Sequence, residues 1–140
     1  MKASGKIIEF NQSHFLEQFS GSLTLFDTVL EIARQLAEQP IRKIFFVGCG
    51  APHHLFYCLE YWASKYAANT TFHRYFPAEF VLHAPLALDE HSLVIFGSHS
   101  GTTKETVEAA QFTRQSSAQS LAITQSADSP LGQAVDHTIA

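Results

Sequence analysis

A cluster of hydroxyl side chains stands between an apolar run and a helical pattern at residues 96–105, in the order Phe-Gly-Ser-His-Ser-Gly-Thr-Thr-Lys-Glu. The preceding run, 92–96, is short, β-branched and aromatic, which predicts a buried strand. A helix N-terminus offers unpaired N–H groups and a partial positive charge, and adjacent hydroxyls with a glycine suit a phosphate there. The stretch therefore predicts a phosphate site built from Ser98, Ser100, Gly101, Thr102 and Thr103.

The same stretch also fits an ordinary capped turn between a strand and a helix. Thr102 and Glu105 have the spacing of a capping box, and Ser or Thr caps are common at helix starts. Neither standard phosphate-loop pattern, G-x-x-x-x-G-K-[ST] or G-x-G-x-x-G, occurs here. The density of hydroxyls favours anion binding, and both interpretations remain open at this point.

A second turn of similar kind follows another apolar run. Residues 43–47 predict a buried strand, which leads into Gly-Cys-Gly-Ala-Pro at 48–52. The apolar spacing of Leu55, Leu59 and Trp62 then predicts a helix of about four turns, with its proline in the first turn. The chain therefore contains two strand, glycine-rich turn and helix units.

Strands alternate with helices along the rest of the chain, which predicts an α/β fold with a parallel sheet covered on both faces. Ligands in such folds bind outside the carboxyl ends of the strands, so both turns and Glu79 should converge on one site. The other predicted helices are a short one at 13–19, an amphipathic one at 22–38 and others at 78–82, 103–116 and 129–133, and the other predicted strands are 70–76, 120–124 and 136–140.

The helix predicted at 22–38 carries an apolar face about half its circumference wide, and Pro40 ends it. That width is typical either of a helix that meets a partner as well as its own sheet or of a well-buried helix in a single domain. A loop at Pro85 separates the helix at 78–82 from the strand at 92–96.

Composition narrows the class of protein. The 140 residues are 46% hydrophobic and carry a net charge of −4 without a basic run, which argues for a globular chain and against a nucleic-acid partner. No stretch approaches the length of a membrane helix, and no apolar segment follows the first residues as in a signal peptide. Cys49 and Cys58 form neither a CxxC motif nor a disulfide framework, so we expect a cytoplasmic protein.

Three patches in order resemble the sugar-isomerase (SIS) domain family. They are Val-Gly-Cys-Gly at 47–50, Ala-Glu-Phe at 78–80 and the loop 98–105, which is similar to the family pattern S-x-S-G-x-T-x-E. Asp-Ser-Pro-Leu at 128–131 is similar to the family's usual segment before its last strand. The resemblance covers roughly residues 40–140 and implies a flavodoxin-like three-layer αβα sandwich with a five-stranded parallel sheet, in which Ser98, Ser100 and Thr103 hold a phosphate.

Within that family the chain is most similar to the amino-terminal half of fructosamine-6-phosphate deglycases and of the isomerase part of glucosamine-6-phosphate synthase. The resemblance implies an N-terminal arm and helix at 1–40 and a phosphosugar-binding domain at 41–140, the first of two in a longer protein. It further implies a homodimer or higher oligomer, no cofactor, and little activity in this chain alone. A phosphosugar-sensing module without catalysis is the alternative.

Candidate sugar and catalytic residues follow from the same resemblance. Cys49, Gly50 and Ala51 occupy the family's first sugar-contacting turn, although the synthases have hydroxyl residues where this chain has Ala51 and Pro52. Glu79, as a base, can move the proton of an aldose–ketose isomerisation, and its alternative role is a cap or a salt bridge. His99 is either an acid/base or sugar-oxygen donor or a solvent-facing loop residue.

The remaining chemically reactive residues give weaker signals. His53, His54, His83 and His99 lack the spacing of a metal site, so none is predicted. Cys49 lacks an identified partner base, so we do not expect it to act as a nucleophile.

Overall fold

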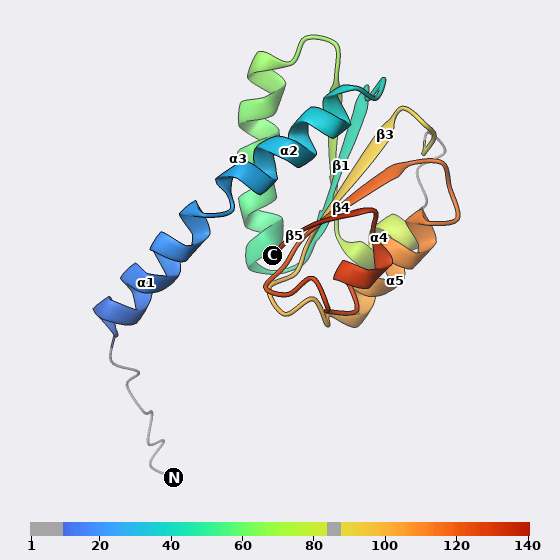
Figure 1. Ribbon diagram of the computed structural model, residues 1–140. Coiled ribbons are helices and arrows are strands. Elements are labelled where there is room, and N and C mark those ends of the chain that lie inside the picture. The colour runs from blue at the N-terminus through green and yellow to red at the C-terminus, as the bar shows by residue number, and fades with distance from the viewer. Residues whose placement is uncertain (1–9, 84–87) are drawn as a thin grey trace.

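The computed structural model describes residues 10–83 and 88–140 and shows an α/β fold in three layers (Figure 1). Its five strands pair in parallel in the order β2-β1-β3-β4-β5. Helix α3 covers one face of the sheet, with α2 on the same side, and α4 and α5 cover the other face (Figure 1). The helices are α1 (Gln12–Leu23), α2 (Phe26–Ala37), α3 (Ala51–Tyr66), α4 (Pro77–Leu82), α5 (Lys104–Thr113) and the 3₁₀ turn η1 (Gly132–Ala134), and the strands are β1 (Lys43–Gly48), β2 (Thr71–Tyr75), β3 (Ser92–Gly97), β4 (Gln119–Ile123) and β5 (His137–Ile139).

The predicted fold class is therefore confirmed, including the parallel five-stranded sheet. The apolar strands β1 and β3 pair with each other at the centre from Lys43 opposite Ser92 to Gly48 opposite Gly97. Because the sheet is parallel, the turns after β1 and β3 leave from the same edge, and the carboxyl ends of all strands meet there.

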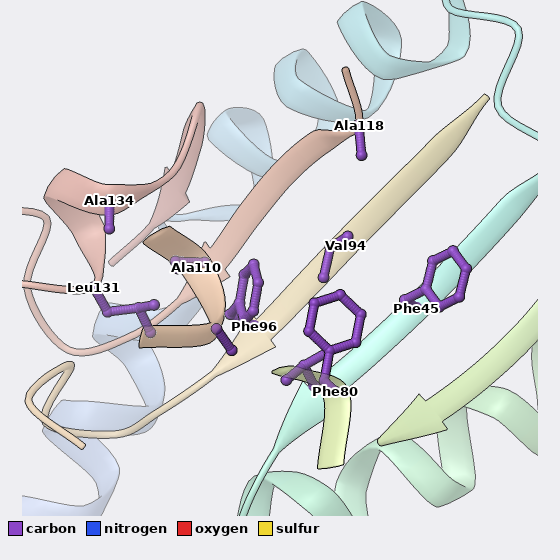
Figure 2. Packing of buried hydrophobic residues seen from close by; sticks show 11 residues of the cluster. Phe45, Phe80, Val94, Phe96, Ala110, Ala118, Leu131 and Ala134 are labelled. Atoms are coloured by element: carbon purple, nitrogen blue, oxygen red, sulfur yellow. The ribbon is translucent and has the colours of Figure 1, made fainter. Parts of the chain in front are cut away.

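Alternating side chains of β1 divide the core between the two faces. Phe45 points toward α4, where its ring lies 6.2 Å from that of Phe80. Phe46 points the other way and stacks on Phe56 of α3 at 5.2 Å. Figure 2 shows Phe80 between Phe45 and Phe96, at the centre of the buried cluster under α4 and α5. Two phenylalanines next to each other in sequence thus fix both helical layers.

Several predicted boundaries need correction. The predicted helix 22–38 is wrong at its start, because the chain turns at Thr24 and Leu25 and α2 begins at Phe26. The helix predicted at 13–19 is longer and extends through Leu23, where the N–H and hydroxyl of Thr24 bond to the Gly21 carbonyl. The helix predicted at 129–133 is only the 3₁₀ turn η1, and the loop residue Pro85 lies outside the described residues.

The two N-terminal helices have few contacts with the sheet. No residue of α1 or α2 is buried, so the alternative of a well-buried helix at 22–38 is wrong. Instead, Phe15, Phe19, Leu23, Phe26 and Leu30 are exposed, and this set of five is called the N-terminal apolar row below. No helix among the described residues has both the length and the apolar character to cross a membrane.

A buried histidine, His53, packs at the carboxyl ends of β1 and β2. His53, in the first turn of α3, stacks on Phe76 at 3.9 Å and its Nε2 accepts a hydrogen bond from Arg74. Arg74 also forms an ion pair with Glu60 at 3.1 Å. Burial, and then the neighbouring Arg74 charge, lower the pKa of His53 below its ordinary 6.5. The imidazole is therefore neutral in the folded protein near neutral pH.

We predict that this histidine makes the fold less stable in mild acid. The unfolded chain takes up a proton on His53 at a higher pH than the folded chain does, so its contribution to the free energy of unfolding is present above pH 6.5 and is lost as the pH falls below it. Urea unfolding at about pH 7.5 and about pH 5.5 measures this loss. The difference between the two midpoints should shrink in His53→Asn and persist in His14→Asn, a control at an exposed histidine of α1. An unchanged difference in His53→Asn would contradict the assignment.

Candidate functional site

The loop between β3 and α5 gathers the predicted hydroxyl side chains into two pairs. Ser98 Oγ lies 3.0 Å from Thr103 Oγ1, and Ser100 Oγ lies 2.8 Å from Thr102 Oγ1. The Ser98 residue is buried, whereas Ser100 and Thr102 are exposed. The loop thus has one inner pair, which closes it, and one outer pair, which faces solvent and is free to meet a ligand.

The backbone of this loop is fixed by hydrogen bonds within the loop and to the segment after β4. Gly101 has φ 65°, and its N–H donates to the Ser98 carbonyl at 3.2 Å. The Leu131 N–H donates to the Gly101 carbonyl at 2.9 Å, and the Gln125 N–H donates to the His99 carbonyl at 2.9 Å. The loop therefore rests on the segment that follows β4.

The start of α5 offers backbone donors beside the hydroxyls. Thr103 is the N-cap but its side chain bonds Ser98 rather than the helix, so the predicted Thr102–Glu105 capping box is wrong. The N–H groups of Thr103, Lys104 and Glu105 have no acceptor among the described residues, as expected of a first helical turn. Lys104 lies along the helix, 3.7 Å from Glu108. The arrangement has the donors and the positive helix end that an oxyanion requires.

A groove of about 690 Å³ opens beside the loop at the carboxyl edge of the sheet. One wall is the first half of α3, with Pro52, Leu55 and Leu59, and the opposite wall is formed by residues 97–99 and 123–125. Two residues of α1, Gln18 and Ser22, close one side. This space is called the α3 groove below, and its volume is within the usual range of small-molecule sites.

The structure brings some of the predicted site residues to this groove and leaves others away from it. His99, Ser98 and Ala51 line it. Cys49 is half-buried and Gly50 is exposed, with φ 63°, at the N-cap of α3, and neither lines the groove.

Glu79 and the other histidines have structural contacts of their own. Glu79 lies on α4, under the opposite face of the sheet from α3, and its carboxylate accepts the Phe76 N–H at 3.4 Å. His54 Nδ1 lies 2.8 Å from the Gly50 carbonyl. Among the described residues, no three His, Cys, Asp or Glu side chains come together as metal ligands. The capping contact of Glu79 fits its alternative role, and a catalytic role remains a prediction.

Sequence reasoning missed two parts of the site. The apolar wall of the α3 groove was visible only as core spacing of Leu55 and Leu59, because a sequence pattern does not show which helix face remains open. The Ser-Pro-Leu segment was the sequence signal for the residues that support the loop. Ser129 of this segment packs against Gly101 so closely that a Cβ added to the glycine would lie 2.1 Å from Ser129 Oγ. That this segment packs under the loop could not be inferred from its position in the sequence.

Comparisons with known proteins match the family and the fold. The SIS domain family model matches residues 36–140. The fructosamine deglycase FrlB of Bacillus subtilis is 38% identical over 71% of this chain and 30% of its own length, and the fructoselysine 6-phosphate deglycase of Escherichia coli K12 is 29% identical over 77% and 32%. A crystal structure from Salmonella typhimurium LT2, provisionally named a phosphosugar isomerase, has TM-score 0.72 and 33% identity over 77% of this chain and 32% of that one. The chain spans about a third of the length of the curated relatives that it matches.

We predict that Gly101→Ala destabilises the protein more than Gly50→Ala does. The substitution adds left-handed backbone strain and places a Cβ against Ser129 and Thr124, so the free energy of unfolding should fall by more than about 2 kcal/mol. Gly50→Ala is a matched control, because its φ is similar but nothing lies within 4 Å of the added Cβ. Gly50 has ψ −132°, in a backbone region that is almost restricted to glycine, so its substitution should cost roughly 1–3 kcal/mol of backbone strain without a steric contact. Equal losses in the two variants, measured by urea unfolding, would show that the contact with Ser129 does not matter.

Proposed function

Because the chain belongs to the SIS domain family, we propose that it binds a phosphorylated sugar or fructosamine through the loop at 98–103. The observation that carries the proposal is the exposed pair of Ser100 and Thr102 hydroxyls at the start of α5. Beside it lie three N–H groups that have no acceptor among the described residues. Such N–H and hydroxyl groups can donate hydrogen bonds to phosphate oxygens without a change of the backbone. Ser98, Gly101 and Thr103 hold the loop in place, and Ser100 and Thr102 meet the anion.

The sugar extends from this phosphate along the carboxyl edge toward the first turn of α3. Cys49, Gly50 and Ala51 form that turn, and their backbone atoms are the sugar contacts in this proposal. Ala51 supports it most directly, because it lines the α3 groove together with His99. No cofactor takes part.

We further propose that the chain is the amino-terminal part of a phosphosugar isomerase or fructosamine-6-phosphate deglycase. The names of the curated relatives and their threefold greater length support this proposal. In this proposal residues 41–140 form the first of two phosphosugar-binding domains, and the segment 1–40 precedes it. His99 serves as acid/base or sugar-oxygen donor and Glu79 as a base, and the reaction needs groups from the rest of the protein, so this chain alone has little activity.

The alternative is a phosphosugar sensor without catalysis. The separation of Glu79 from the α3 groove favours that alternative, because none of the described residues that line the groove is a carboxylate. The acidic net charge and the lack of a basic recognition helix before β1 argue against a regulator that binds DNA through these residues. A cytoplasmic location belongs to either proposal and suits the two free thiols, Cys49 and Cys58.

We predict that Ser100→Ala weakens binding of a sugar phosphate by about tenfold, the usual worth of a hydrogen bond to a charged group. The hydroxyl is exposed and forms no contact with the core, so stability should change little. Calorimetric titration with glucosamine 6-phosphate, fructose 6-phosphate and their unphosphorylated parents measures both the affinity and the share that the phosphate contributes. Ser117→Ala is the matched control, since Ser117 is an exposed serine that precedes β4 at the opposite edge of the sheet. Equal affinity for phosphorylated and unphosphorylated sugars would show that the loop is only a turn.

A second copy of the chain is the proposed partner of the N-terminal apolar row. All five large apolar side chains of this row are exposed on α1 and α2, and exposed apolar surface of this extent is typical of an interface. We predict that sedimentation at micromolar to millimolar concentration shows a dimer or higher oligomer. Phe19→Ser with Phe26→Ser should shift it toward monomer, whereas Leu82→Ser, at an exposed leucine of α4, should not. A monomer at the highest concentration would remove self-association from the proposal.

A further inference from the structure

The lining of the α3 groove is partly polar and partly apolar. Ser98, His99 and Thr124 belong to the loops after β3 and β4, whereas Leu55 and Leu59 lie further along α3. Together with Ile123, the last residue of β4, these two leucines are called the apolar end of the groove. Figure 1 shows why these elements meet, since the start of α3 and the loops after β3 and β4 all lie at one edge of the sheet. Ser100 and Thr102, which meet the phosphate in the proposed function, do not line the groove, but their neighbours Ser98 and His99 do. A substituent carried by a phosphosugar on the loop could therefore reach the leucine side chains of α3.

The apolar end is open, not filled by the fold. Leu55 is 64% exposed, Leu59 is 48% exposed and Ile123, at the end of an inner strand, is 41% exposed. Inner strands of a covered parallel sheet are ordinarily buried on both faces. Apolar surface of this kind gains free energy when a ligand removes it from water.

Charge limits which ligand can occupy the groove. Among the residues that the structure describes, none that lines the groove is an aspartate, glutamate, lysine or arginine. A charged group that packs against these side chains would lose part of its hydration without gaining a partner of opposite charge. An aliphatic or aromatic group has no charge whose hydration would be lost.

From this geometry we propose that the α3 groove is the specificity site for an uncharged aliphatic or aromatic group that the phosphosugar carries, for example on its amine. This inference rests on the proposed function, because the loop at 98–103 supplies the phosphate anchor that orients the ligand. Leu55 and Leu59 determine the preference and His99 marks the boundary between sugar and substituent. The groove discriminates against substituents that end in an ammonium, such as lysine.

Three fructosamine 6-phosphates that share the sugar, phosphate and amine test this proposal. One has no substituent, one carries N-pentyl, and one carries N-(4-aminobutyl), which has the same length but ends in an ammonium. Each buried methylene favours binding by roughly a factor of four, so we expect the pentyl compound to bind the chain at least about tenfold more tightly than the unsubstituted one. The aminobutyl compound should bind no more tightly than the unsubstituted one.

A charge placed in the groove should reverse the preference. Leu55→Glu should remove the advantage of the pentyl compound and strengthen binding of the aminobutyl compound. Leu55 is exposed, so the variant should fold, and circular dichroism checks this. Leu82→Glu is the matched control, because Leu82 is 78% exposed on α4 and does not line the groove. Its ligand preference should equal that of the unchanged chain.

The outcomes separate this inference from the function on which it rests. Equal affinity for the pentyl and unsubstituted compounds, with phosphate still required, overturns the groove proposal and leaves the phosphosugar function standing. Binding that is indifferent to the phosphate overturns both. A pentyl advantage that Leu55→Glu and Leu82→Glu reduce equally assigns the effect to general apolar binding and also overturns the groove proposal.

Discussion

The close packing of Gly101 against the segment after β4 is the constraint that fixes the loop at the carboxyl edge of the sheet. Gly101 adopts a left-handed conformation, and its missing side chain leaves the space that Ser129 and Thr124 occupy. This contact joins two crossover connections that are separate in sequence, and it keeps Ser100 and the start of α5 in register with the end of the sheet. A residue with any side chain would have to displace Ser129 and Thr124, so the same glycine sets both the loop conformation and the position of the hydroxyls.

Most of the fold could be predicted from the sequence, because its strong local patterns were all consistent with one topology. The apolar runs of β1 and β3 and the glycine-rich turns after them are typical of central parallel strands, and the structure places both at the centre. Helix ends were harder to predict. The continuous apolar pattern across Thr24 concealed the turn between α1 and α2, since periodicity persists through a one-residue or two-residue break.

The candidate site was predictable where chemistry is local and unpredictable where it depends on exposure. The hydroxyls of the 98–103 loop are neighbours in sequence, so their pairing follows almost directly from the turn. The predicted capping box failed because Thr103 found a better partner in Ser98 than in its own helix. The open wall of the α3 groove could not be predicted, because Leu55 and Leu59 have the same spacing as core residues and differ from them only in what lies opposite.

The exposed position of α1 has a consequence for the kinetics of ligand capture. Helix α1 buries no residue, so little free energy opposes its transient detachment from the domain, yet Gln18 and Ser22 close one side of the α3 groove. The groove is complete only during the fraction of time in which α1 is docked, and the apparent affinity falls in proportion to that fraction. Any contact that holds α1 in place, including a second copy of the chain on the N-terminal apolar row, would thereby tighten ligand binding without touching the ligand.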